Sequence, residues 1–380
     1  MHKNLIFLLI MKVINMKTNI KMEYLSCEIV QLIVDQCDFL SKIRMTIINK
    51  YFYDSIQIYD LLNIPKKYSK KLNDEILQQK KFKNLKKLNA ENEITQKGIQ
   101  ELNLVELNAK NNMNITNVSF MNRLKYLNVD DCIKFYQEGI KGLNLIELNA
   151  CNTKITNFSF MKNLKILNIG GLFGDINQKS IEGLDLIKLN LNCNGSVGNI
   201  SFMKNLKYLD VSGHDCKIDQ KEIEGLDLIE LNISYNNNIN DVSFMKNLKK
   251  LKINEKINHD GMKGLDLTEL DISNNAKITD IRFMKNLKIL NASGYHCRLN
   301  QKGIEGLDLI ELKINDNTHI KNISFMKNLK RLIAKGEYCK INQKGIRGLD
   351  LVELNIYNNG RIKDVSFMKN LKKLNGIKIR

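Results

Sequence analysis

Residues 201–242 read SFMKNLKYLDVSGHDCKIDQKEIEGLDLIELNISYNNNINDV, and this stretch predicts the fold because close copies of it recur down the chain. Copies of its first seven letters begin at intervals of 39 to 42 residues. Their first residues are Ser119, Ser159, Ser201, Ser243, Arg282, Ser324 and Ser366. So regular a period indicates stacked copies of one small unit and not a single globular core.

Each period contains two shorter units that open with the pattern L-x-x-L-x-[IVLA] or close to it. In the unit that begins at Leu228, Leu231 and Ile233 point to the same side of an extended strand, because strand side chains alternate. One such strand cannot bury its apolar side alone, so each unit must stack on the next. The fifteen units begin at Leu85, Leu104, Leu124, Leu145, Leu164, Leu186, Leu206, Leu228, Leu248, Leu267, Leu287, Leu309, Leu329, Leu351 and Leu371.

The chain is strongly basic: its 380 residues include 59 Lys and Arg against 41 Asp and Glu, a formal charge of +18. A nucleic-acid surface is one interpretation of this charge. Only 8 of the basic residues are Arg, however, so we favour a solvated lysine-rich surface over nucleic-acid binding. The turns place one Lys in each long period, at Lys162, Lys204, Lys246, Lys285, Lys327 and Lys369.

The sequence lacks the motifs that carry catalysis or cofactor binding. No G-x-G-x-x-G follows a strand, and the phosphate-loop, nucleophile-elbow, H-E-x-x-H and calcium-loop patterns are absent. His214 with Cys216, and His296 with Cys297, suggest zinc, but the two pairs lie four strands apart, whereas structural zinc needs four ligands together. We therefore predict no enzyme activity, catalytic residue, cofactor, metal or small-molecule substrate.

The cysteines indicate a reducing compartment. Eight are present without a CxxC pair, and Cys297 and Cys339 occupy matching places two strands apart, or about 10 Å. A disulfide requires Cα atoms within about 7 Å, so we predict reduced thiols that fill the core and a cytoplasmic, not secreted, protein. The apolar stretch Leu5–Met11 is too short to span a membrane.

The repeat resembles the leucine-rich-repeat family from about Leu85 to the C-terminus. The resemblance implies an α/β solenoid, a superhelix with a parallel concave sheet of about 15 units. One kind of return segment, INQKGIEGLD at Ile341–Asp350, resembles the short helices of ribonuclease-inhibitor-like repeats. The other kind, ITDIRFMKNLK at Ile278–Lys288, resembles the tighter turns of internalin-like repeats, which we expect to be 3₁₀.

An Asn at the family's ninth position recurs in the GLDLIEL-type units. In leucine-rich repeats this side chain turns inward and hydrogen-bonds the loop backbone of adjacent units, which implies a structural ladder here. Its members are Asn112, Asn194, Asn236, Asn275, Asn317 and Asn359. The intervening units carry Cys132, Leu172, His214, Lys256, Tyr295 and Glu337 at that position, so we expect an alternating ladder.

The third residue of each unit should lie on the exposed face of the sheet and form a column with its neighbours. An apolar and aromatic part of this column is a candidate surface for a target protein, since aromatic residues supply much contact energy. The other interpretation is that Glu and Lys on neighbouring strands neutralise each other. The predicted target-binding residues are Tyr126, Ile166, Tyr208, Glu230, Glu269, Glu311 and Arg331.

Residues 22–62 differ from the repeats, and their apolar spacing predicts three short helices. The first runs from about Leu25 to Val34, with Ser26 as its cap, and the second covers 40–48. The third follows Phe52 and continues to Leu61. Three such helices bury too little surface to be stable alone, so this module needs a partner.

This segment resembles an F-box, whose family opens Leu-Pro-x-Glu-(Ile/Leu). Here Ser26 replaces the Pro, and the matching residues are Leu25, Glu28, Ile29, Ile33, Lys50 and Phe52. An F-box ahead of the repeats is the order of F-box/leucine-rich-repeat proteins, and Asn/Lys/Ile-rich versions occur in giant DNA viruses of amoebae. The resemblance implies that these six residues bind a Skp-type adaptor, while the repeats hold a target protein for an SCF-type cullin-RING ubiquitin ligase.

The predicted organisation is an N-terminal extension at 1–21, an F-box-like helical module at 22–62, a linker or cap at 63–84 and a leucine-rich-repeat solenoid at 85–380. Near Lys373 the last strand is expected to have no cap, only lysines that discourage edge pairing. Two further interpretations remain: a free-standing interaction scaffold whose helices only cap the solenoid, and a basic nucleic-acid surface.

Overall fold

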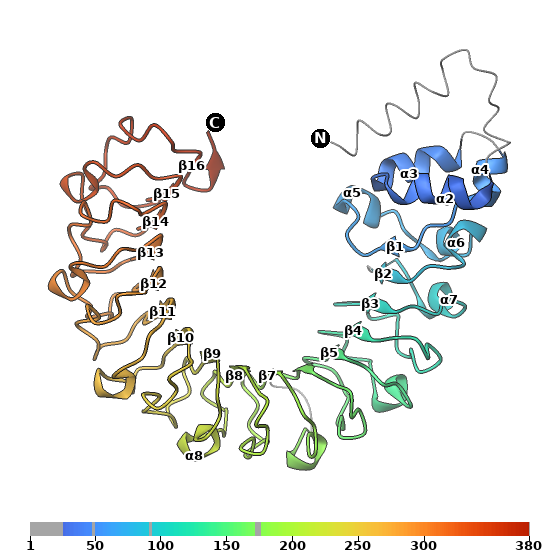
Figure 1. Cartoon of the computed structure of the whole chain (residues 1–380), viewed down its shortest axis with the longest axis horizontal. Coiled ribbons are helices and arrows are strands. Elements are labelled where there is room, and N and C mark those ends of the chain that lie inside the picture. The colour runs from blue at the N-terminus through green and yellow to red at the C-terminus, as the bar shows by residue number, and fades with distance from the viewer. Residues whose placement is uncertain (1–25, 48–49, 91–92, 172–175, 380) are drawn as a thin grey trace. The chain divides into compact units, whose positions relative to one another are not determined.

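The protein, described by a computed structural model, is built from short parallel strands that succeed one another along the chain (Figure 1). The structure describes residues 26–47, 50–90, 93–171 and 176–379, so Leu25 and the predicted extension at 1–21 lie outside the described residues. The chain forms two compact units, called the first unit (Met1–Leu164) and the second unit (Lys165–Arg380), and each of them contains several of the short repeat units. No helix in the described ranges is long and apolar enough to cross a lipid bilayer.

The first unit begins with helices and continues into repeats. Its α-helices are α2 (Cys27–Asp35), α3 (Phe39–Thr46), α4 (Lys50–Ser55), α5 (Lys66–Ser69), α6 (Asp74–Leu77) and α7 (Gln96–Ile99). Its 3₁₀ helices are η2 (Lys80–Phe82) and η3 (Gln137–Ile140). Its strands are β1 (Asp60–Leu61), β2 (Lys87–Asn89), β3 (Glu106–Asn108), β4 (Tyr126–Asn128) and β5 (Glu147–Asn149).

The second unit consists of repeats throughout. Its strands are β6 (Ile166–Asn168), β7 (Lys188–Asn190), β8 (Tyr208–Asp210), β9 (Glu230–Asn232), β10 (Lys250–Lys252), β11 (Glu269–Asp271), β12 (Ile289–Asn291), β13 (Glu311–Lys313), β14 (Arg331–Ile333), β15 (Glu353–Asn355), β16 (Lys373–Leu374) and β17 (Ile377–Lys378). Its helical turns are η4 (Gln178–Ser180), α8 (Gln220–Ile223), η5 (Asp260–Met262), η6 (Lys302–Ile304) and η7 (Lys344–Ile346).

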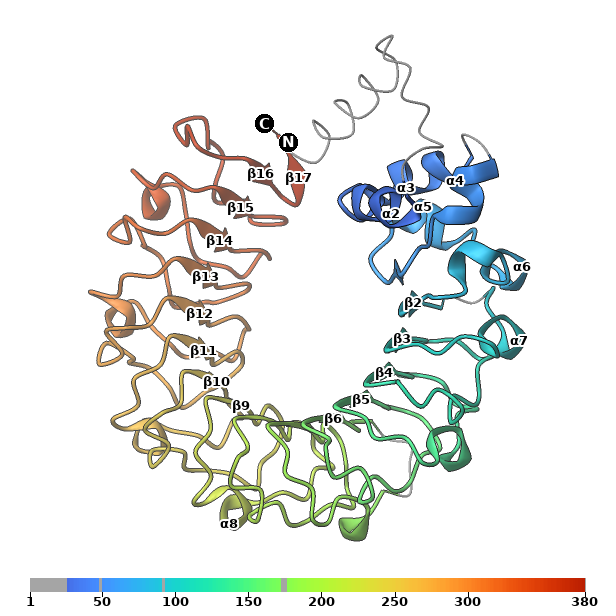
Figure 2. The ribbon, with the colours of Figure 1, turned by 45° about the vertical axis from the view of Figure 1, so that its right-hand side comes forward.

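Each of the fifteen predicted units holds one strand, from β2 to β16, so the predicted repeat is confirmed. In the unit of β9, Leu228, Leu231 and Ile233 are at most 1% exposed, because the units on either side cover them. Apart from the terminal pair β16–β17, neighbouring strands within each of the two compact units pair in parallel and without a slip in register. Glu230, for example, lies opposite both Tyr208 and Lys250. The strands form one side of the second unit and the return turns the other (Figure 2).

The return segments differ from the prediction in detail. Of the described QKGI-type segments, α7 and α8 are single α-helical turns, and the others are 3₁₀. Gly303 shows why larger residues do not fit, since a Cβ there would collide with the carbonyl oxygen of Thr279 in the preceding unit. The FMKN segments, expected to be 3₁₀ helices, are separate turns, in which Met203 N–H bonds Ile200 O and Leu206 N–H bonds Met203 O.

Two elements correct the expected chain path. The third helix was predicted to continue to Leu61, but it ends at Ser55. The N–H of Ile58 bonds the carbonyl oxygen of Lys81 at 2.8 Å and not a helical carbonyl, and Asp60–Leu61 then pairs with β2 as a strand. At the other end, β17 folds back on β16 in an antiparallel hairpin and caps the last strand. Asn375 and Gly376 both have positive φ, as a tight two-residue hairpin turn requires.

A row of buried Asn side chains joins successive repeats. In Asn275 the Nδ2 donates to the carbonyl oxygens of Asn254 at 2.8 Å and Ile257 at 3.1 Å, both in the preceding unit. Its Oδ1 accepts the N–H groups of Lys277 and Ile278 at 2.8 and 2.9 Å. Asn112, Asn194, Asn236, Asn275, Asn317 and Asn359 are all buried, and each Oδ1 accepts an N–H of its own loop.

Four of the intervening units fill this row differently from the prediction, whereas Cys132 is buried at its expected place, with its Sγ 3.0 Å from Ala109 O, and Leu172 lies outside the described residues. In three of them the loop is longer than assumed, and the inward residues are Cys216, Cys297 and Cys339 in place of His214, Tyr295 and Glu337. The Cys339 Sγ lies 3.3 Å from the carbonyl oxygen of Ile314 in the preceding unit. After β10 the loop is shorter, so Asn254 takes the position assigned to Lys256 and donates to Ile239 O at 2.8 Å.

Candidate functional site

The exposed face of the sheet in the second unit carries charges that largely pair with one another. Third-position residues of adjacent strands lie side by side, and Lys250 contacts Glu269 at 3.4 Å. Further along, Arg331 lies between two carboxylates, at 2.9 Å from Glu311 and 3.2 Å from Glu353. This part of the face therefore matches the interpretation of mutual neutralisation and offers few unpaired charges to a ligand.

Glu311 shows the electrostatic balance on this face. Burial alone would raise the pKa of its carboxyl group, but hydrogen bonds from Lys313 and Arg331 outweigh burial, so the pKa lies below its ordinary value. The Lys313 ammonium is 3.1 Å from the carboxylate. Glu311 is consequently held as a carboxylate by its neighbours before any ligand arrives.

The predicted aromatic patch is divided. Tyr126 belongs to the first unit, whereas Ile166 and Tyr208 belong to the second, where Lys188 lies between them in the sheet register. Around Tyr208 the face is hollowed into a shallow groove of about 180 Å³, which Glu230 also lines. Ile166 and Tyr208 are both half-buried, and the charged Lys188 separates them. The feature of this face that could receive a ligand is therefore the groove at Tyr208 and not one continuous apolar patch.

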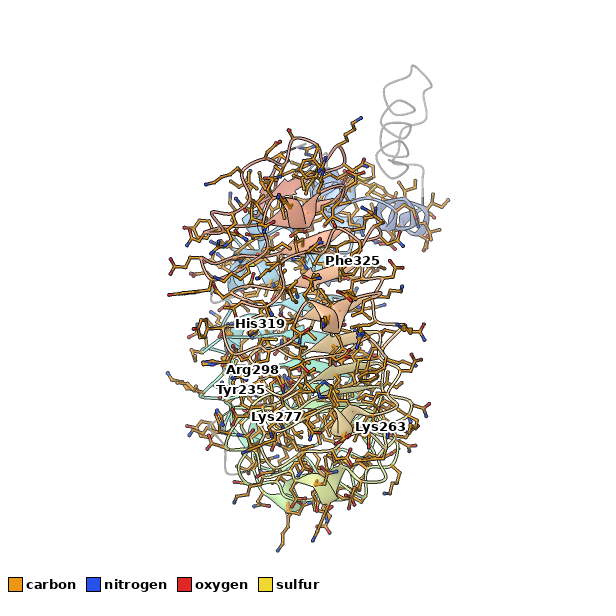
Figure 3. All side chains as sticks on the ribbon, turned by 90° about the vertical axis from the view of Figure 1, so that its left-hand side faces the viewer. Tyr235, Lys263, Lys277, Arg298, His319 and Phe325 are labelled. Atoms are coloured by element: carbon orange, nitrogen blue, oxygen red, sulfur yellow. The ribbon has the colours of Figure 1, made fainter. Side chains whose placement is uncertain are left out.

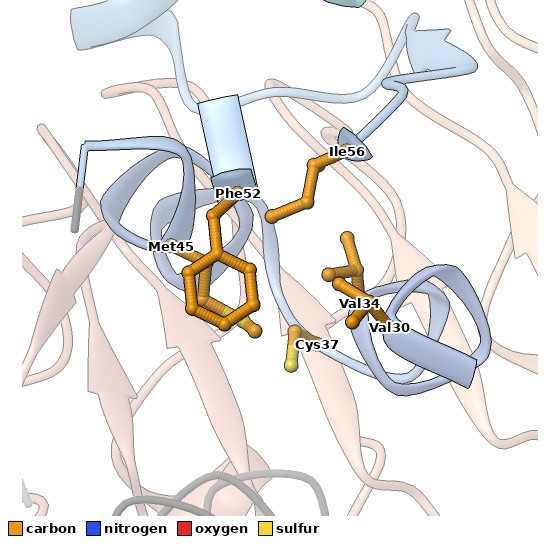
Figure 4. Close-up of a cluster of buried hydrophobic side chains, with 6 residues drawn as sticks. All are labelled: Val30, Val34, Cys37, Met45, Phe52 and Ile56. Carbon is orange, nitrogen blue, oxygen red and sulfur yellow. The ribbon is translucent and has the colours of Figure 1, made fainter. Parts of the chain in front are cut away.

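The helical module has a small closed core. Val30 and Val34 of α2 pack toward Met45 of α3 and Phe52 of α4 (Figure 4). Phe52 is 2% exposed, so it holds the helices together and is not available as a contact surface. Gln31 ties α2 to the chain that follows α4, because its Oε1 accepts the N–H of Gln57 at 2.8 Å and its Nε2 donates to the same residue's carbonyl at 3.1 Å.

The opposite face of α2 remains apolar and open. Ile29 is 46% exposed and Leu32 is 66% exposed, while Ile33 packs against the edge of the core. Glu28 lies exposed in the first turn, where a hydrogen bond from the Ser26 side chain lowers its pKa. Of the other predicted adaptor-binding residues, Lys50 is exposed and Leu25 lies outside the described residues.

Sequence patterns missed two exposed apolar residues of this module. Leu32 was absent from the F-box match, and Ile47, at the end of α3, is 75% exposed. The helical spacing of Ile29, Leu32 and Ile33 contained the signal, but the choice of the buried face depends on where α3 and α4 pack.

One of the turn lysines, Lys246, bonds to backbone. Lys246 Nζ donates to the carbonyl oxygen of Ser243 at 2.6 Å and reaches toward Lys263 O at 3.5 Å. It lies over Gly264, whose left-handed φ of 76° leaves room for it. Lys246 therefore satisfies a carbonyl group of its own turn, a role that the count of charges did not suggest.

The thiols of the inward row are inert by burial. Burial raises the pKa of Cys216, Cys297 and Cys339 to about 11, far above that of a reactive thiol. All eight Cys are free, and within the described residues no three His, Cys, Asp or Glu side chains gather as metal ligands would. Cys27, at the start of α2, is exposed.

No family model matches the chain, and no curated protein matches it. Similar solved structures include the internalin InlF of Listeria monocytogenes, 19% identical, with a TM-score of 0.46 over 74% of this chain and 88% of that chain. The functional domain of InlJ from the same organism is 19% identical, with a TM-score of 0.37 over 78% and 59%. Rad7 in its complex with Elc1 from yeast is 17% identical, with a TM-score of 0.44 over 81% and 85%. Similarities at this level carry no inference about function.

Proposed function

We propose that this chain is a non-catalytic adaptor, in which the helical module docks a Skp-type adaptor of an SCF-type cullin-RING ubiquitin ligase and the repeats hold a target protein. The observation that carries the proposal is the exposed apolar face of α2 beside a core that is already filled. An apolar face that its own fold leaves open is typical of a protein interface.

In this proposal Ile29, Leu32 and Ile33 form the apolar centre of the contact. Glu28 lies one turn away and supplies a carboxylate at the rim, as Lys50 supplies a cation. Phe52 acts from inside, by fixing α4 against α2. Ser26, where an F-box has Pro, begins α2 in an extended conformation (φ −61°, ψ 152°), with a φ close to that of Pro, so the backbone entry to the helix is compatible with the motif.

The repeats would hold the target at the sheet face, with Tyr126 in the first unit, and with Ile166 and the groove around Tyr208 and Glu230 in the second. Glu269, Glu311 and Arg331 would then define the charged border of the contact. Such a protein makes no bonds itself. It raises the local concentration of the target near the ubiquitin-loaded enzyme. The free thiols agree with a reducing, cytoplasmic location, and a viral origin is proposed from the Asn/Lys/Ile-rich composition alone.

The second candidate is an interaction scaffold whose helices only cap the repeats. Contacts between the module and the following segment favour it: the rings of Phe39 and Tyr68 are 5.9 Å apart, and Lys80 pairs with Asp54 at 3.4 Å. A cap of this kind needs no partner, so the two candidates differ in what Ile29 and Leu32 do.

Co-purification of the full chain with a Skp-type adaptor separates the candidates. The double variant Ile29→Asp with Leu32→Asp should lose at least about thirtyfold in affinity, the cost of losing one interface hot spot. The matched control is Ile187→Asp with Ile310→Asp, whose side chains are 42% and 47% exposed in the second unit. Both variants should melt like the wild type. A wild-type chain that folds but binds no adaptor would overturn the proposal in favour of the cap.

A further inference from the structure

One edge of the second unit carries a column of basic residues, which we call the loop edge. The residue directly before the buried Ile or Leu that closes the loop after the strand is basic in six consecutive units, from Lys256 onward, and the last five form the loop edge: Lys277, Arg298, His319, Lys340 and Arg361. These positions are equivalent in the backbone. The N–H of Lys277 bonds Asn275 Oδ1 at 2.8 Å, and the N–H of Arg298 in the next unit bonds the carbonyl oxygen of the same Asn275 at 3.2 Å.

Copying of the repeat does not explain this column. The residue alternates among Lys, Arg and His, and it occurs both in loops with an inward Asn, such as that of Asn317, and in longer loops with an inward Cys, such as that of Cys339. Basic character is therefore retained while the residue and the loop length both change. This pattern points to a requirement at the surface and not to the history of the sequence.

The charges of the loop edge are not neutralised. Within the described residues, Lys277, Arg298, Lys340 and Arg361 form no ion pair, in contrast to Arg331 on the sheet face, which contacts two carboxylates. Asp316 and Glu337 are the carboxylates on the same five loops, and Asp316 accepts the N–H of Tyr338 at 3.4 Å. Adjacent units are about 4.8 Å apart, less than the Debye length of about 8 Å, so neighbouring cations reinforce one another.

Exposed aromatic rings accompany the cations. Tyr295, Tyr338 and Tyr357 are 59%, 51% and 63% exposed on these loops, and the rings of Tyr295 and Tyr338 meet edge to face at 5.6 Å. A hollow of about 810 Å³ lies between Tyr338 and Tyr357. Lys277, Arg298 and His319 lie on one side of the strands, whereas Lys263 and Phe325 lie on the other (Figure 3).

We infer that the loop edge binds single-stranded nucleic acid, with its cations on successive phosphates and its tyrosine rings on bases. A polymer with one charge per nucleotide matches a column with one cation per unit, and stacking on aromatic rings needs no particular sequence. An acidic peptide would match the cations but not the rings. The total charge of the chain concealed this edge, because lysines are spread along the whole sequence and the column emerges only when loops of unequal length are aligned.

The test is fluorescence anisotropy of the full chain with a labelled oligouridylate or oligothymidylate, titrated between about 50 and 200 mM salt. The variant Lys277→Gln, Arg298→Gln, Lys340→Gln, Arg361→Gln should reduce the slope of log K against log salt by about 2.8, at about 0.7 per phosphate contact. The control Lys204→Gln, Lys246→Gln, Lys285→Gln, Lys327→Gln removes the same charge from the FMKN turns and should leave the slope unchanged.

The tyrosines distinguish nucleic acid from an acidic peptide. Tyr295→Leu with Tyr338→Leu should weaken oligonucleotide binding about fivefold or more for each base that stacks, and should leave the binding of polyglutamate unchanged. Three outcomes would each overturn the inference. They are an equal loss of salt slope in the two fourfold variants, an equal affinity of the chain for the oligonucleotide and for polyglutamate, and no oligonucleotide binding at the lowest salt. Because the α2 face is untouched by these variants, adaptor binding remains an independent readout of the proposed function.

Discussion

The helical module and the repeats of the second unit bury apolar side chains in different ways. A repeat is completed by its neighbours, and in consequence the strand leucines from Leu231 to Leu332 are at most 1% exposed. The module closes a core of six buried residues and leaves Ile29, Leu32 and Ile47 from 46% to 75% exposed. The difference teaches that a repeat finds its partner in the next copy of itself, whereas the module keeps an open apolar face, which in the proposed function another protein covers.

The first prediction breaks the module without breaking the repeats. Phe52→Ala should cost about 3–5 kcal/mol, because it removes the largest side chain from a core that has few others to replace it. We expect α2, α3 and α4 to lose hydrogen-exchange protection while β9 to β13 keep theirs. Leu32→Ala is the control, since its side chain is 66% exposed and its loss should change stability by less than about 0.5 kcal/mol. Equal loss of protection in β9 to β13 would show that the two regions are not separately stabilised.

The second prediction compares two kinds of repeat. Asn275→Ala should cost about 4 kcal/mol, because two carbonyl and two N–H groups lose their partner, at the low end of about 1–3 kcal/mol for each unpaired group. Cys297→Ala, one unit later, should cost about 1 kcal/mol, since that side chain mainly fills volume. Urea unfolding measures both. Similar costs would mean that the thiol row bonds the backbone as strongly as the amide row.

The strands were predictable from the sequence because their signal is local. Leu228, Leu231 and Ile233 carry the alternation within six residues, and the Asn row follows at a fixed distance wherever the loop has the usual length. Asn254 and Cys297 were not assigned to the inward row, although Cys297 was expected in the core, because their loops are shorter or longer, which moves the inward position. The sequence cannot show this change without the neighbouring unit against which the loop closes.

The candidate surfaces were less predictable for the same reason. The residues of the sheet face follow from strand alternation, but which charges meet depends on register and side-chain reach, as in the pairing of Arg331 with Glu311 and Glu353. The loop edge depends on aligning Lys277 with Arg298 across loops of unequal length. The terminal hairpin was missed although Asn375–Gly376 is a strong turn signal, because the last repeat was expected to end as an open edge.

The smallest predicted effect concerns the paired charges of the sheet face. Because the pKa of Glu311 is lowered in the folded chain, its carboxylate stabilises the fold at pH values above its unfolded pKa of about 4.3, and this contribution fades as the pH falls through the folded pKa. Glu311→Gln should therefore lower the free energy of unfolding by about 1 kcal/mol or less at neutral pH and by nothing in acid. Urea unfolding at both pH values measures the difference.

Glu230→Gln is the control, since Glu230 lies in the same column and forms no ion pair among the described residues. It should change stability less than Glu311→Gln at neutral pH. If the two variants behave alike, the pairing of Glu311 with Arg331 contributes nothing to the fold. Its charges would then be as free for a ligand as those of the loop edge, and the contrast between these two surfaces would disappear.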